Sequence, residues 1–139
     1  MSAALVVRES AFPVAETVER LTAALARRGV TVFATIDHAD GAHRAGLTLA
    51  DEVLLVFGNP AVGTALLQAD ARTGLDLPLR LLVWDDGGTT RTAFHDPHDL
   101  AADYDLTGHE QVLGGLRGLL DALTAEVAEG AAVPVPPAG

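Results

Sequence analysis

Cysteine is absent from this chain of 139 residues. That absence excludes disulfide bonds, thiolate nucleophiles and zinc sites built on cysteine. Lysine is absent as well, because all nine basic residues are arginine. Neither Schiff-base chemistry nor the lysine of a Walker-type phosphate loop is therefore available. The only serines are Ser2 and Ser10, both near the N-terminus, which argues against a Ser-His-Asp hydrolase.

Long apolar runs and a basic leader are also missing. No apolar run reaches the ~20 residues that span a bilayer. The N-terminus lacks the basic region and long apolar stretch of a secretory signal. These absences predict a cytoplasmic protein. The net charge of −10 repels phosphate backbones and anionic membranes, so we expect neither nucleic acid nor a membrane as a partner.

The residues that are present favour one folded domain. Apolar residues make up 49% of the chain, which is too many for a disordered protein and enough for a core of ordinary size. Patterns of apolar residues and turn residues predict five strands. The strands are expected from Ala4 to Val7, Val30 to Ile36, Val53 to Phe57, Leu79 to Trp84 and Thr89 to Phe94.

Helices are expected between most of these strands. Pro13 begins the first, and the second is a short, alanine-rich helix that runs to Gly46. Asn59 and Pro60 begin the third, and Thr107 begins the last, in a sequence that fits a capping box. We expect a single domain over residues 1–128, followed by a disordered, proline- and alanine-rich tail at 129–139.

The order of elements predicts an α+β fold. It is strand, helix, strand, short helix, strand, helix, hairpin, helix, and the hairpin argues against an all-parallel sheet. The expected architecture is one five-stranded mixed, mostly antiparallel sheet with helices packed on one face. Val53 to Phe57 is apolar at every position. Such a strand is expected in the interior of the sheet with both of its faces covered.

Five short segments occur in the order seen in a known family. They are Thr17–Leu21, Asp37–Ala39, Phe57–Thr64, Leu77–Leu79 and Asp96–Pro97. Over roughly residues 5 to 128 the chain resembles the domain of unknown function 302 family. Phe-Gly-Asn-Pro-x-x-Gly-Thr is its most specific part. The resemblance implies a compact α+β fold of the TATA-binding-protein-like kind and a homodimer, and it implies no established reaction.

The segment from Gly58 to Thr64 is the first candidate site. It follows a buried strand and begins a helix, and its candidate ligand-binding residues are Gly58, Asn59, Pro60, Gly63 and Thr64. A phosphate loop is not expected, because no lysine follows Gly63 and Pro60 lacks an N–H. A helix N-terminus can still attract a small anion. The alternative is structural: the glycines permit a tight turn and close packing.

Two histidine-containing segments are the other candidates. His38 follows a strand beside Asp37, where it can act as a general base or a ligand, or simply bond to the backbone or water. Asp96 lies in the cluster His95-Asp96-Pro97-His98-Asp99. Its residues suit a divalent metal, although the alternative is a solvated turn in which Asp96 caps a helix.

No complete catalytic constellation is visible, so the first functional hypothesis is a non-catalytic binding protein. We expect a cytoplasmic homodimer that binds a small molecule or a protein partner and needs no cofactor. The alternative hypothesis is an acid–base or metal-assisted enzyme that uses His38 with Asp37 or Asp96.

Overall fold

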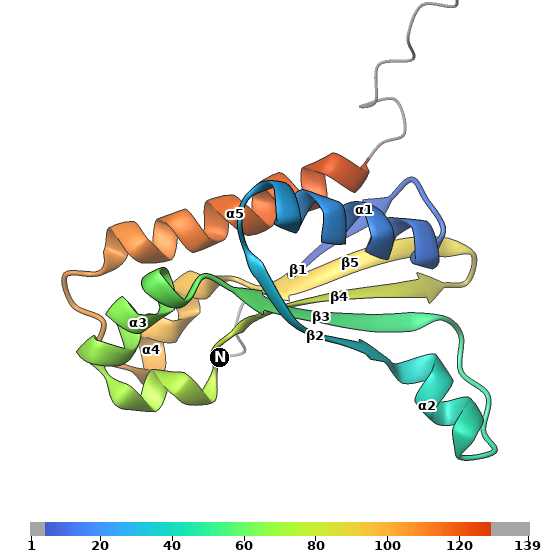
Figure 1. Cartoon of the computed structure of the whole chain (residues 1–139), viewed down its shortest axis with the longest axis horizontal. Coiled ribbons are helices and arrows are strands. Elements are labelled where there is room, and N and C mark those ends of the chain that lie inside the picture. Colours follow the sequence, from blue (N-terminus) through green and yellow to red (C-terminus); the bar gives the residue numbers. More distant parts are fainter. Residues whose placement is uncertain (1–4, 129–139) are drawn as a thin grey trace, which may run out of the picture.

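The computed structural model describes residues 5–128. It contains one five-stranded sheet with two long helices, α1 and α5, side by side on one face (Figure 1). The strands are β1 (Leu5–Ser10), β2 (Thr31–Asp37), β3 (Glu52–Gly58), β4 (Leu79–Asp86) and β5 (Thr89–His95). The predicted tail at 129–139 lies outside the described residues.

Helices fill most of the connections between the strands. The α-helices are α1 (Val14–Arg27), α2 (His38–Arg44), α3 (Pro60–Ala69), α4 (Leu100–Asp103) and α5 (Glu110–Ala128). Two short 3₁₀ helices, η1 (Ala71–Leu75) and η2 (Pro97–Asp99), complete the set. In Figure 1, α2 projects from one end of the sheet, and α3 lies at the opposite end.

The strand order is β1-β5-β4-β3-β2, and every neighbouring pair is antiparallel. The predicted α+β fold is therefore confirmed, with a sheet that contains no parallel pair among the described residues. β3 is an interior strand, as its apolar sequence predicted. β2 carries an irregularity between Val32 and Ala34, so Phe33 is an extra residue in its pairing with β3.

The core lies between the sheet and the two long helices. Alternate residues of β3 and β4, such as Leu55, Phe57 and Leu81, are fully buried there. Leu21 and Leu25 of α1 pack on them, as do three residues of α5. These are Leu120, Leu123 and Val127. The apolar residues of the helices recur at helical spacing and therefore share one side of each helix. Those of the strands recur at every second position and share one face of the sheet, and these two apolar surfaces face each other.

Candidate functional site

The end of β3 leads directly into α3. Gly58 is the last residue of β3, and Pro60 is the first residue of α3. Between them, the Asn59 side-chain oxygen accepts a hydrogen bond of 3.0 Å from the backbone N–H of Ala61. The predicted helix cap and proline start are both confirmed. The consequence is a short, well-defined turn rather than a loop.

This turn lines a cavity of about 280 Å³. All five residues that the sequence selected in the turn contribute to its wall. They are Gly58, Asn59, Pro60, Gly63 and Thr64. The rest of the wall is nearly all apolar and comes from four parts of the chain. These are Phe33 of β2, Leu67 of α3, Gly74 with Leu77 to Leu79, and Leu116 of α5.

Neither glycine of the turn is required by the conformation of the backbone. Both lie outside the set of residues with positive φ. A Cβ atom at Gly58 would lie 3.6 Å from Cε2 of Phe33, which is ordinary contact. A Cβ atom at Gly63 would meet no atom within 4 Å. The structural alternative of a strained turn or close packing therefore has no support at either position.

The N-terminus of α3 has no free N–H group to offer an anion. Pro60 has none, and Ala61 donates to the Asn59 side chain. The N–H groups of Val62 and Gly63 both donate to the Asn59 carbonyl, at 3.0 and 2.8 Å. Attraction of an anion, which the sequence alone had suggested, therefore lacks the donors it needs.

Two polar side-chain groups remain available beside the cavity. Asn59 and Thr64 are both exposed. Among residues 5–128, the Asn59 amide nitrogen and the Thr64 hydroxyl make no hydrogen bond. The cavity thus combines an apolar wall with one amide donor and one hydroxyl group, and its wall contains no titratable residue.

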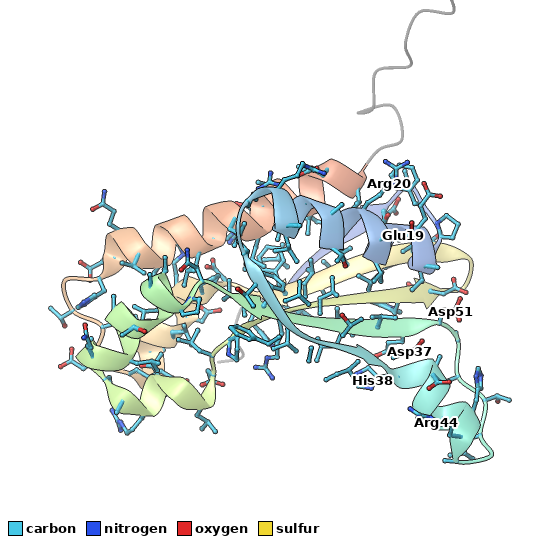
Figure 2. All side chains as sticks on the ribbon, viewed as in Figure 1. Glu19, Arg20, Asp37, His38, Arg44 and Asp51 are labelled. Carbon is cyan, nitrogen blue, oxygen red and sulfur yellow. The ribbon has the colours of Figure 1, made fainter. Side chains whose placement is uncertain are left out.

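His38 does not join this cavity. In the pairing of β2 with β3, Gly58 lies opposite Thr31, whereas Asp37 lies opposite Val53. Five positions at about 3.4 Å separate these ends by about 17 Å. Figure 2 shows Asp37 and His38 where α2 begins, at the far end of the sheet. His38 therefore lies apart from the Gly58 turn, because β2 and β3 are antiparallel.

Asp37 also lacks the arrangement of a catalytic partner for His38. Its Oδ1 accepts a hydrogen bond of 2.9 Å from the backbone N–H of Asp40 and thereby caps α2. His38 itself is exposed as the first residue of α2. Capping of α2 is therefore the role that the structure gives to Asp37.

Asp96 lines a second, neighbouring cavity of about 240 Å³. The two cavities share Pro78 and Leu79. The second one is acidic, with Asp76, Asp99 and Asp103 beside Asp96, and it also contains Arg80 and His95. Asp96 therefore lies close to the Gly58 turn in the fold, but it lines the second cavity and not the first.

Asp96 is held by several partners. Its Oδ1 accepts hydrogen bonds from the backbone N–H of His98 at 3.0 Å and lies 2.8 Å from the ring Nδ1 of His98. Its Oδ2 accepts a bond of 2.6 Å from Arg117. Burial disfavours its charge, but the bonds to His98 and the nearby charges outweigh this and lower the pKa of Asp96. The predicted capping role of Asp96 is confirmed.

Asp76, another carboxylate of the acidic cavity, also has a partner. The Tyr104 hydroxyl donates a hydrogen bond to Asp76, which is the main reason that the pKa of Tyr104 rises to about 12. Within residues 5–128, no three His, Cys, Asp or Glu side chains are grouped so that they could hold a metal ion. The cluster from His95 to Asp99 is a capped turn.

Sequence reasoning missed Phe33 and Leu116 as wall residues. Phe33 is 52% exposed and belongs to the irregular part of β2. The sequence signal for Phe33 was an aromatic residue at a strand position where the alternation has polar residues on either side, at Thr31 and Thr35. Leu116 lies on the apolar stripe of α5, which looked like core from the sequence. Leu77 and Pro78 stand out in the sequence only as part of the family pattern.

Comparisons with known proteins identify relatives of nearly the whole chain. A family described as "Domain of unknown function DUF302" matches residues 6–123. The crystal structure of the uncharacterized conserved protein DUF302 from Bacillus stearothermophilus superposes with a TM-score of 0.80. That comparison covers 88% of this chain and 97% of the other at 22% identity, and it shows a shared fold.

Curated relatives are larger than this chain. Proteins named fluoride-specific ion channel FluC 1 from Brucella suis and Brucella abortus are 46% identical to it over 103 residues. The match covers 73% of this chain but only 41% and 38% of those proteins. The chain thus spans about two fifths of their length. Over residues 5–128, no helix has the length and apolar character needed to cross a membrane.

Proposed function

The chain belongs to the DUF302 family, and on that premise we propose that it is a non-catalytic homodimer that binds a small, mostly apolar molecule. The ligand occupies the cavity between the start of α3 and the Leu77–Leu79 segment. It makes its polar contacts with Asn59 and Thr64.

The observation that carries this proposal is the open space at Gly63. A glycine in a helix costs about 1 kcal/mol relative to alanine. No atom lies within 4 Å of the position that a Cβ would take at Gly63, so packing within this chain does not explain that cost. The same residue lines the cavity. Open space alone also occurs at Gly118, so it is the position of Gly63 in the cavity wall that supports a ligand there.

The size and lining of the cavity define the ligand class. Its volume of about 280 Å³ lies near the lower end of the ~300–1,000 Å³ typical of small-molecule sites. Apolar walls favour an aliphatic or aromatic body. The free amide nitrogen of Asn59 suits a hydrogen-bond acceptor, and the Thr64 hydroxyl can accept or donate. A neutral molecule about the size of indole fits these features.

The alternative of an acid–base enzyme has less support. The walls of the cavity contain no Asp, Glu, His, Lys or Arg residue. His38 and Asp96, two of the three groups put forward for proton transfer, belong to opposite ends of the sheet. The third, Asp37, caps α2. Binding without chemistry is the function that this arrangement favours.

An NMR titration tests the proposal. Indole and 1-hexanol, which share an apolar body and one polar group, are added to ¹⁵N-labelled protein. We expect the amide signals of Gly58, Gly63 and Gly74 to move most, because these residues line the cavity. Gly63→Leu fills the open space and should abolish the response.

A matched variant distinguishes blocking of the cavity from a general effect of placing leucine in a helix. Gly118 lies within α5, and a Cβ there also meets no atom within 4 Å. It does not line the cavity, so Gly118→Leu should leave the titration unchanged. If neither probe moves the cavity amides, or if both still bind Gly63→Leu, the proposed site is wrong.

A homodimeric state and a cytoplasmic location are further parts of the proposal. The family resemblance suggests the homodimer, and the absence of cysteine fits the reducing cytoplasm. Light scattering at micromolar concentration tests the homodimer: a mass near 29 kDa is expected, about twice that of the 14.4 kDa chain. A mass of one chain would contradict it.

A second candidate function is a role in a fluoride channel system. The observation that favours it is the 46% identity to part of proteins named fluoride-specific ion channel. If the domain itself responds to fluoride, sodium fluoride should raise its melting temperature above that seen in sodium chloride of equal concentration. Equal melting temperatures in the two salts would count against it.

A further inference from the structure

One face of the sheet lacks a helical cover among the described elements. In Figure 1, α1 and α5 lie along the other face, and the shorter helices lie toward the ends of the sheet. Every position of β3 from Val53 to Phe57 is apolar, which predicted a strand covered on both faces. Val53, Leu55 and Phe57 belong to the buried core, so Leu54 and Val56 belong to the open face.

A continuous apolar row crosses this open face. The strand register places one residue of each strand side by side across the sheet. In strand order from β2 to β1, they are Ile36, Leu54, Leu82, Ala93 and Val7. The two ends of the row are markedly exposed, with Ile36 at 42% and Val7 at 45%. We call these five residues the central row.

Two unpaired charges of opposite sign flank the central row. Arg80 lies opposite Val56, on one side of the row, and Glu52 lies opposite Trp84, on the other side. Each is two residues from the row along its own strand, Arg80 before Leu82 and Glu52 before Leu54. Within residues 5–128, neither Arg80 nor Glu52 has an ion pair or a side-chain hydrogen bond. Both charges are therefore available to a partner.

We propose that a second copy of this chain covers the open face, with a two-fold axis along the central row. This inference rests on the homodimer of the proposed function and specifies its interface. A half-turn about that axis places each strand of the partner over the same strand of the first copy. The two strands then run in opposite directions. The apolar rows then face each other, and each Arg80 comes to the end of the sheet that holds the partner's Glu52.

The chemistry of the face favours a copy of itself over another occupant. A two-fold interface must be complementary to itself, and equal spacing of opposite charges about an apolar row satisfies that condition. Stacked sheets lie about 10 Å apart, a gap that Arg and Glu side chains can bridge together. The interface would contain two such ion pairs, one on each side of the row.

The same axis also brings unlike ends of the two sheets together. Because the partner's strands run in the opposite direction, its α2 end lies toward the end of the sheet that contains Phe33 and Gly58. The segment that begins at His38, which is remote from that end in one chain, is therefore nearer to it in the dimer.

Charge reversal tests the interface by analytical ultracentrifugation of the full chain. Arg80→Glu and Glu52→Arg should each weaken the dimer at least tenfold, because each places like charges in contact. The double variant restores opposite charges and should recover the dimer. Glu19→Arg is the control, since Glu19 is exposed on α1, on the covered side of the sheet (Figure 2).

The outcomes distinguish this interface from the homodimer itself. Monomeric wild-type protein overturns both. A wild-type dimer that neither single reversal weakens overturns the interface and leaves the homodimer standing. Weakening by both single reversals without recovery in the double variant overturns the two-fold pairing of Arg80 with the partner's Glu52. Circular dichroism confirms that each variant is folded.

Discussion

The carboxylate of Asp96 accepts a hydrogen bond of 2.6 Å from the guanidinium of Arg117, which joins the end of β5 to α5. Arg117 also pairs with Asp121 at 3.0 Å, and Asp121 pairs with Arg8 at 2.8 Å. Burial opposes the charge of Asp121, but bonds from Arg117 and Arg8 outweigh it and lower its pKa, as happens at Asp96. This network links β1, β5 and α5 by charge.

The first prediction concerns the acid sensitivity of Asp96. Its pKa is lower in the folded chain than its ordinary value, so its stabilising contribution is present above pH ~4 and is lost as pH falls through the folded pKa. Asp96→Asn should lower the melting temperature at pH 7 and make the loss of stability between pH 5 and 2 shallower. Thermal unfolding across this range checks both effects.

A surface carboxylate provides the comparison for that measurement. Glu19 is exposed and has no ion pair or side-chain hydrogen bond within the described residues. Glu19→Gln should therefore reproduce the acid profile of the unchanged protein. An Asp96→Asn profile that is equally steep would show that Asp96 contributes nothing to acid unfolding.

The second prediction concerns two buried threonines. Thr92 is fully buried, and its hydroxyl has no hydrogen-bond partner among the described residues. Thr92→Val removes an unsatisfied polar group and should raise the free energy of unfolding by about 1 kcal/mol. Urea unfolding measures this change.

Thr17 is the matched control for Thr92. It is also fully buried, but its hydroxyl lies 2.6 Å from that of Ser10 and donates to the Phe12 carbonyl at 3.1 Å. Thr17→Val should lower the free energy of unfolding by about 1–3 kcal/mol. Changes of the same sign in both variants would contradict the assignment of partners.

The third prediction separates the two roles of Asn59. Its oxygen caps α3, and its amide nitrogen is the proposed ligand contact. Asn59→Ala should cost about 1 kcal/mol of stability, whereas Asn59→Asp keeps a capping oxygen and should cost nearly nothing. The aspartate lacks the amide donor, so a ligand that presents a carbonyl oxygen should bind it less tightly. Equal binding to Asn59→Asp would remove Asn59 from the site.

The fourth prediction concerns the methyl group that Gly63 lacks. Gly63→Ala and Gly118→Ala both replace a helical glycine beside open space. Each should raise the free energy of unfolding by about 0.5–1 kcal/mol. Only Gly63→Ala should weaken the binding of indole, because only Gly63 lines the cavity. Unfolding curves and titrations of the same samples provide both measurements.

Local patterns in the sequence predicted the elements because each depends on neighbouring residues. The alternation from Val30 to Ile36 and the Asn59-Pro60 helix start are set by backbone sterics and capping. The hairpin after β4 follows in the same way from its glycines. These features gave the order of elements and the α+β class before any pairing was known.

The arrangement of the candidate site depended on strand pairing, which local patterns do not contain. His38 and Gly58 both follow strands, and nothing near either residue specifies that β2 and β3 are antiparallel. The wall residues Phe33 and Leu116 are separated from Gly58 by tens of positions and meet it only in the folded chain. The turn could therefore be selected from the sequence, but its cavity could not.

The open space at Gly63 has a consequence for laboratory evolution of this protein. A screen that rewards heat resistance alone would favour alanine at position 63, because the added methyl group meets no obstacle there. Such a screen would narrow the cavity while it improved the fold. Thermostable descendants of this chain should therefore be sequenced at position 63 before they are used to search for its ligand.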